Sequence, residues 1–130
     1  MQIIKKKMNY FTYDEFDSPD MPGSGSLMHE DFLDMLDEVR DKFGKPIIIN
    51  SGYRTEEHNA AVGGKPKTET SKGSSHMYGL AADIKCTNST DRFHLIFLLQ
   101  ETGFQRIGVA DTFIHVDLDF DKSQQVMWTY

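Results

Sequence analysis

The stretch Gly73–Ile84 constrains the fold of this chain more than any other part of the sequence. It reads Gly-Ser-Ser-His-Met-Tyr-Gly-Leu-Ala-Ala-Asp-Ile, so a histidine and an aspartate lie seven positions apart, separated by a glycine turn and a short apolar run. The apolar run is typical of a strand, whose successive side chains point to opposite faces, and Asp83 lies on the face opposite its apolar neighbours. Such a carboxylate is costly to bury unless something compensates its charge, as a metal ion bound together with His76 would.

A second segment, Phe113–Leu118, has a matching pattern. Its apolar residues alternate with polar ones, so His115 and Asp117 point to the same side of a strand. Two histidines and one aspartate, His76, Asp83 and His115, would bind zinc and leave a fourth position open, as catalytic zinc sites do. Spacing alone leaves a second interpretation open, because a half-buried strand can carry a histidine whose ring bonds to a backbone carbonyl.

Three motifs occur in order along the chain: Ser51-Gly-Tyr-Arg54, Ser74-x-His-x-x-Gly-x-Ala-x-Asp-Ile84 and His115-Val-Asp117. Together they resemble the zinc D-Ala-D-Ala carboxypeptidases and phage peptidoglycan endopeptidases, in particular their small single-domain carboxypeptidase-like branch. The resemblance runs from about Phe11 to Asp117. It implies the fold shared by D-Ala-D-Ala peptidases and the hedgehog signalling domain, zinc as cofactor, and peptidoglycan stem peptides as substrate. It does not distinguish a carboxypeptidase from an endopeptidase.

The composition is that of one ordinary globular domain. The 130 residues are 38% hydrophobic and 26% charged, which suits a single core, and we expect residues 1–8 to form a disordered extension of that domain. The formal net charge of −6 and the lack of a basic stripe beyond the lysines at 5–7 argue against nucleic-acid binding. The single cysteine, Cys86, excludes an intramolecular disulfide and is expected in the core. We expect a monomer.

Membrane insertion is not expected, because no apolar run reaches the roughly eighteen residues that a spanning helix needs. The lysines at 5–7 are followed by a polar and aromatic segment rather than by the apolar region of a signal peptide. We therefore expect a cytoplasmic protein that acts on the cell wall once it is released, as a phage lysis protein does.

Periodicity and helix-capping residues predict an α+β domain with helices packed on an antiparallel-type sheet. An aromatic arm over residues 9–26 is expected to pack on the core, and the loop at 65–75 to act as a lid or rim of the site. The predicted helices span 28–43, 55–63 and 88–101, and the predicted strands span 47–50, 80–86, 106–110, 113–119 and 125–130.

The resemblance also implies roles for Arg54 and Ser74. Arg54 follows a predicted strand and a glycine turn, and it would bind a substrate carboxylate or stabilise a developing oxyanion. The alternative is a surface arginine paired with Glu56 or Glu57. Ser74 would contact substrate or only cap the turn before His76.

The sequence offers two candidates for the general base. Related enzymes often carry an acidic residue three positions before the second histidine, but here that position is Thr112. Asp111 lies one step earlier and would reach the site only if the chain turns or bulges there, and on that condition we predict a catalytic role for Asp111. Asp117 is the other candidate, although the motif favours it as a partner that supports a ligand.

Three functions are compatible with these residues. The first is a zinc metallopeptidase acting on peptidoglycan stem peptides. The second is a module that binds a ligand beside a structural zinc, which the missing carboxylate at Thr112 permits. The third is a virion or tail component that uses the fold for assembly. The sequence shows no repeat or extended adhesive surface of the kind that would favour the third.

Overall fold

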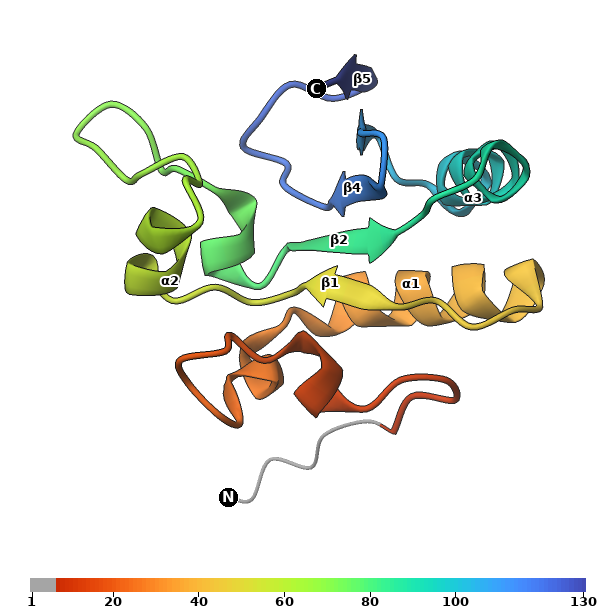
Figure 1. The fold of residues 1–130 in the computed structure, drawn as a ribbon. Coiled ribbons are helices and arrows are strands. Elements are labelled where there is room, and N and C mark those ends of the chain that lie inside the picture. Colours follow the sequence, from red (N-terminus) through yellow and green to blue (C-terminus); the bar gives the residue numbers. More distant parts are fainter. Residues whose placement is uncertain (1–6) are drawn as a thin grey trace.

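The computed structural model describes residues 7–130, and its helices and strands follow the order expected from the sequence (Figure 1). Most element boundaries lie within two residues of the expected ones. The helices are α1 (Glu30–Phe43), α2 (Glu56–Ala61) and α3 (Ser89–Thr102), and the 3-10 turns are η1 (Tyr13–Phe16), η2 (Ser24–Leu27) and η3 (Ser75–Tyr78). The strands are β1 (Ile49–Ser51), β2 (Ala81–Lys85), β3 (Arg106–Val109), β4 (Phe113–Asp117) and β5 (Val126–Thr129).

The strands form one sheet in the order β1-β2-β4-β3-β5. The antiparallel pair of β2 and β4 lies at its centre, in a register that places Asp83 opposite His115 and Ala81 opposite Asp117. Together with the helices, this sheet confirms the predicted α+β class.

The strand β5 is the exception to the antiparallel pattern, because it pairs with β3 in parallel. The chain leaves β4 at Asp117, which lies opposite Arg106 at the start of β3. The short connection at 118–125 crosses the start of β3, and β5 then begins at that same end of the sheet, with Val126 opposite Arg106. The strand β5 therefore runs in the direction of β3, and the sheet is mixed.

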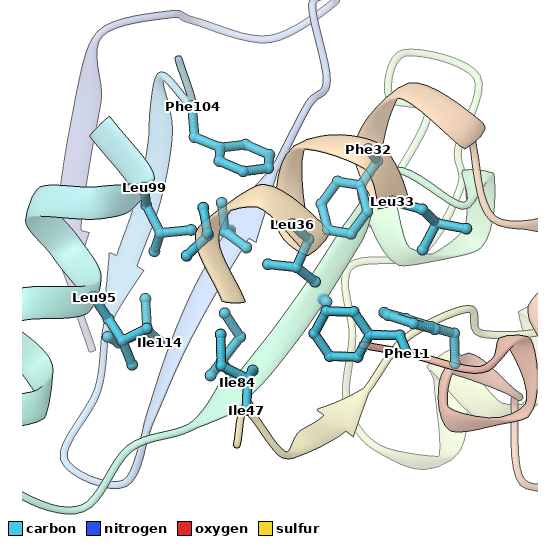
Figure 2. Packing of buried hydrophobic residues seen from close by; sticks show 14 of the residues in the cluster. Phe11, Phe32, Leu33, Leu36, Ile47, Ile84, Leu95, Leu99, Phe104 and Ile114 are labelled. Carbon is cyan, nitrogen blue, oxygen red and sulfur yellow. The ribbon is translucent and has the colours of Figure 1, made fainter. Parts of the chain in front are cut away.

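The core lies between α1, α3 and one face of the sheet (Figure 2). On the two central strands, fully buried apolar side chains alternate with the polar ones singled out from the sequence. The polar side chains are thereby directed to the opposite face. The residues buried from the strands are Ala82, Ile84, Ile114 and Val116, and the helices add Phe32, Leu33, Leu36, Val39, Leu95 and Leu99.

Capping side chains define the helix ends near the site. The Thr55 hydroxyl accepts a hydrogen bond from the backbone N–H of His58 at the start of α2, and the Asn88 side chain accepts one from the N–H of Asp91 at the start of α3. Within residues 7–130, no helix has the length and apolar character needed to cross a membrane.

The arm at residues 9–26 packs on the core as expected. Phe11 and Phe16 are buried and meet edge to face, with ring centroids 5.5 Å apart. Tyr10 is exposed and donates a hydrogen bond to Asp41 on α1. The expected disordered extension at 1–8 falls mostly on residues 1–6, which lie outside the described residues, and Met8 is buried against the core.

Leu99→Ala on α3 should lower the free energy of unfolding by about 2–5 kcal/mol, because its side chain is fully buried and the substitution leaves a cavity. Phe97→Ala on the same helix is the matched control. That ring is 56% exposed, and its removal should change the free energy by no more than about 0.5 kcal/mol. Urea denaturation of both variants measures the difference, and equal losses would contradict this placement of α3.

Candidate metal centre

Three side chains from three segments meet on the face of the sheet opposite the helices. Asp83 lies on β2, His115 lies directly opposite it on β4, and His76 lies on η3 just before β2. His76 Nε2 is 3.3 Å from Asp83 Oδ1, and His115 Nδ1 is 3.0 Å from the same oxygen. One donor atom of each residue lies within 4.8 Å of the other two. The structure therefore brings together the three predicted ligands.

A backbone carbonyl fixes the ring of His76. Its Nδ1 lies 2.8 Å from the carbonyl oxygen of Gly52. A carbonyl oxygen can only accept, so Nδ1 carries the proton and Nε2 presents its lone pair toward Asp83. Burial lowers the pKa of His76 despite the nearby charge of Asp83. The ring is therefore neutral, as a metal-binding histidine must be.

The second histidine is fixed by a carboxylate. His115 Nε2 lies 2.7 Å from Asp117 Oδ2 and donates to it, so that Nδ1 is the atom left to face Asp83. Burial alone would lower the pKa of His115, but Asp117 and Asp83 outweigh it and raise that pKa. Asp117 also accepts a hydrogen bond from Arg106 Nε at 2.7 Å. Its contacts are those of the supporting partner considered in the sequence.

The carboxylate of Asp83 is shared between the histidines and Arg54. While its Oδ1 faces both rings, its Oδ2 lies 3.2 Å from Arg54 Nη2. Burial raises the pKa of Asp83, but the adjacent rings of His115 and His76 outweigh it and hold the pKa far below its usual value. Asp83 is therefore ionised.

Arg54 reaches the site because its other nitrogens are also held. Nε donates to Ser51 Oγ at 3.0 Å, and Nη1 donates to Asn59 Oδ1 at 3.3 Å. Asn59 is itself buried and donates to the carbonyl of Lys65 at 2.9 Å. These contacts exclude the surface alternative, in which Arg54 pairs only with Glu56 or Glu57.

The three free donor atoms fit a zinc ion. Ligand atoms about 2.0–2.1 Å from a tetrahedral zinc lie roughly 3.3 Å from one another. The distances from Asp83 Oδ1 to the two ring nitrogens, 3.3 and 3.0 Å, are close to this value. Two nitrogens and one carboxylate oxygen are also a donor set that zinc accepts, with a fourth position left for water or substrate.

A cleft of about 430 Å³ opens over these residues. Arg54, Ser74 and Lys65 line it, so both ends of the loop at 65–75 form part of its rim. The Ser74 hydroxyl accepts a hydrogen bond from the N–H of His76 at 3.3 Å, which makes Ser74 the cap of η3 as well as a cleft residue.

Aromatic side chains from β4, from β5 and from the residue after β5 form one wall of the cleft: Phe113, Trp128 and Tyr130. The indole of Trp128 lies 5.5 Å from the ring of His115 and 5.1 Å from the guanidinium of Arg106, measured between centres. It can pack against β3 because Gly108 has no side chain there. A Cβ at that position would lie 2.6 Å from Trp128 Nε1.

Asp111 lies away from this cleft. The N–H of Ala110 donates to the carbonyl of Phe113 at 3.0 Å, so a tight turn joins β3 to β4 and leaves Asp111 exposed at its tip. The pairing of the two strands is regular up to Val109 opposite Ile114. The chain therefore turns at Asp111, as the sequence required, but this tight turn has no bulge and does not bring Asp111 to the predicted metal ligands.

Four supporting contacts could not be read from the sequence. The groups that make them are the Gly52 carbonyl, Arg106 and Asp119, which lie 24, 11 and 44 residues from their partners, and Asn59, which lies five residues from Arg54. The sequence pattern pointed only to Asp119, which continues the alternation of His115 and Asp117 by two further residues.

Cys86 is buried as predicted. Burial raises the pKa of its thiol, which suits a core residue rather than a nucleophile.

With this geometry in view, the chain was compared with known proteins. A family model described as Peptidase M15 matches residues 9–117, most of the chain. The chain belongs to the Peptidase M15 family. This is a zinc-dependent family of the D-Ala-D-Ala carboxypeptidase kind, as the motifs suggested, and its match ends at Asp117, the residue that supports His115. No curated protein matches the chain.

The wild-type chain should bind one zinc ion, and His115→Ala should abolish stoichiometric binding, because only two of the three donors then remain. His94→Ala is the control, since His94 is exposed on α3 and far from the M15 motifs. Metal analysis after dialysis against low-micromolar zinc measures both. A His115→Ala protein that retains its zinc would remove this centre from consideration.

Proposed function

We propose that this M15 protein is a zinc metallopeptidase that hydrolyses peptide bonds in peptidoglycan stem peptides. One observation supports the proposal above all. His76 Nε2, Asp83 Oδ1 and His115 Nδ1 face one point, and the other polar atom of each side chain is held by a separate group. A structural zinc site closes its fourth position with a protein ligand, whereas this one opens into a cleft, as a hydrolytic site does.

Arg54 is suited to act on substrate. A guanidinium has five N–H donors, and the bonds to Ser51, Asn59 and Asp83 use one on each nitrogen. One N–H on Nη1 and one on Nη2 remain, at a side chain that lines the cleft. We assign these donors to a substrate carboxylate or to the carbonyl oxygen on which negative charge develops.

The charge of the cleft suits an acidic peptide. The chain carries a formal net charge of −6, yet four cationic side chains line the cleft: Arg54, Lys65, Arg106 and Lys122. Stem peptides carry carboxylates on their acidic residues and at their D-Ala terminus. A local excess of cations over a site attracts such ligands even when the whole protein is acidic.

Zinc bound by these residues would polarise the scissile carbonyl and lower the pKa of a water molecule. The chain itself must then move a proton from the water to the leaving amine. Asp83 and Asp117 are the carboxylates that line the cleft in the described part of the chain, and Asp83 belongs to the ligand set. Asp117 is thus the carboxylate left for this step, and it also holds His115.

The proposal is tested with zinc-loaded protein, purified peptidoglycan and defined stem peptides, with mass spectrometry of the products. Loss of terminal D-Ala would identify a carboxypeptidase, and internal cleavage would identify an endopeptidase. No cleavage with zinc bound and peptide retained would favour the binding module. The cellular setting we propose, release from the cytoplasm to the wall during phage lysis, is a separate expectation.

Arg54→Lys should keep the fold and the zinc but lower kcat by about 10²-fold, because an ammonium cannot reproduce the fixed contacts of a guanidinium. Arg92→Lys on α3 is the matched control, since within residues 7–130 the Arg92 side chain hydrogen-bonds only to Ser89 and the Asp111 carbonyl. Steady-state kinetics on the best stem peptide measures both. Equal rates for Arg54→Lys and wild type would remove Arg54 from the reaction.

Asp111→Asn should hydrolyse stem peptides as fast as wild type, because Asp111 is exposed at the hairpin tip. Asp117→Asn should lose about 10–100-fold in zinc affinity or activity, because Asn cannot hold both His115 and Arg106 as a carboxylate does. Zinc titration and kinetics of both variants separate the two residues. A slow Asp111→Asn enzyme with normal zinc affinity would restore Asp111 as the base.

A further inference from the structure

Asp119 is a buried carboxylate for which the proposed reaction has no use. Its side chain is 1% exposed, two residues beyond the end of β4, and it is not among the residues that line the cleft. Burying a carboxylate is costly unless several donors compensate it. The groups around its carboxylate come from the segment that leads to His76, Lys72 and Ser75, and from the connection after β4, the Asp121 N–H and Lys122.

On one side, Asp119 holds the segment of His76. Its Oδ2 accepts a hydrogen bond of 2.6 Å from the hydroxyl of Ser75, which immediately precedes His76 and is itself buried. Its Oδ1 lies 3.0 Å from Lys72 Nζ, in the loop that leads to Ser75. Lys122 Nζ also donates to Ser75 Oγ at 2.8 Å and lies 3.7 Å from Asp119 Oδ2. These donors hold the pKa of Asp119 below its usual value despite its burial.

On the other side, Asp119 reaches the segment of His115. Its backbone N–H donates to Asp117 Oδ1 at 3.2 Å, and Asp117 Oδ2 is the oxygen that accepts from His115 Nε2. One residue is therefore linked to both histidines, through Ser75 to one and through Asp117 to the other.

The segment of His76 needs such a link. His115 and Asp83 are held by the ladder between β4 and β2, but His76 lies on η3, a turn outside the sheet. Zinc requires its ligand atoms within a few tenths of an ångström of their ideal separation, and partners behind the ligands supply that accuracy. We propose that Asp119 is a positioning residue of the metal centre, which fixes the His76 turn against the His115 strand. This inference rests on the proposed zinc site.

The test compares Asp119→Asn with Asp121→Asn. Asp121 also contacts Lys72, at 3.0 Å, but its side chain is 77% exposed and, within residues 7–130, hydrogen-bonds to neither Ser75 nor Asp117. Asp119→Asn should weaken zinc binding about tenfold, the lower end of the effect of partners behind a ligand, and shift the visible spectrum of the cobalt-substituted protein. Asp121→Asn should leave both unchanged.

A second variant keeps the test decisive if Asp119→Asn does not fold. Ser75→Ala removes the hydroxyl that links Asp119 to the His76 turn but keeps the carboxylate paired with Lys72. It should weaken zinc binding in the same direction, with a thermal midpoint of the metal-free protein close to that of wild type. Unchanged zinc affinity and cobalt spectrum in both variants would overturn the role of Asp119. A wild-type chain that binds no zinc would overturn the proposed function with it.

Discussion

The ionised carboxylate of Asp83 is the group on which the site depends. It lies on a central strand with apolar core residues on either side of it along the chain, where an unpaired charge would destabilise the fold. Two imidazoles and a guanidinium surround it, and each of these is held by a further group. The same arrangement brings one donor atom of each of the three side chains within reach of a single metal ion. The stability of the buried charge and the capacity to hold a metal therefore depend on the same group of side chains.

The two faces of the sheet have different roles: one packs in the apolar core, and the other carries the polar side chains of the cleft. Alternation along β2 and β4 sends Ile84 and Ile114 into the core and Asp83 and His115 to the cleft. The core against α1 and α3 needs no polar group from the cleft side. A two-residue period therefore lets the metal centre sit directly behind well-packed apolar side chains, which hold its backbone rigid.

Local patterns in the sequence predicted the ligands but not the groups that hold them. The period of two placed His115 and Asp117 on one side, and the motifs placed His76, Asp83 and Arg54 together, as the structure does. The Gly52 carbonyl reaches His76 from 24 residues away, which no local pattern encodes, and the contact between Asn59 and Arg54, although only five residues apart, depends on how both side chains are buried. Asp111 was predicted to act only if the chain turned or bulged toward the site. The tight hairpin that forms there leaves its side chain exposed at the tip.

The strand β5 is only partly buried, and it carries the Trp128 wall of the cleft but none of the three predicted metal ligands. No residue of β5 is fully buried, and its pairing partner in the sheet is β3 alone. Strands with so little burial open at a small fraction of the global unfolding free energy. Opening of β5 would carry the Trp128 wall away from the cleft, while β2, β4 and the core behind them stay paired. The width of the cleft thus depends on an edge strand that contributes none of the three predicted metal ligands.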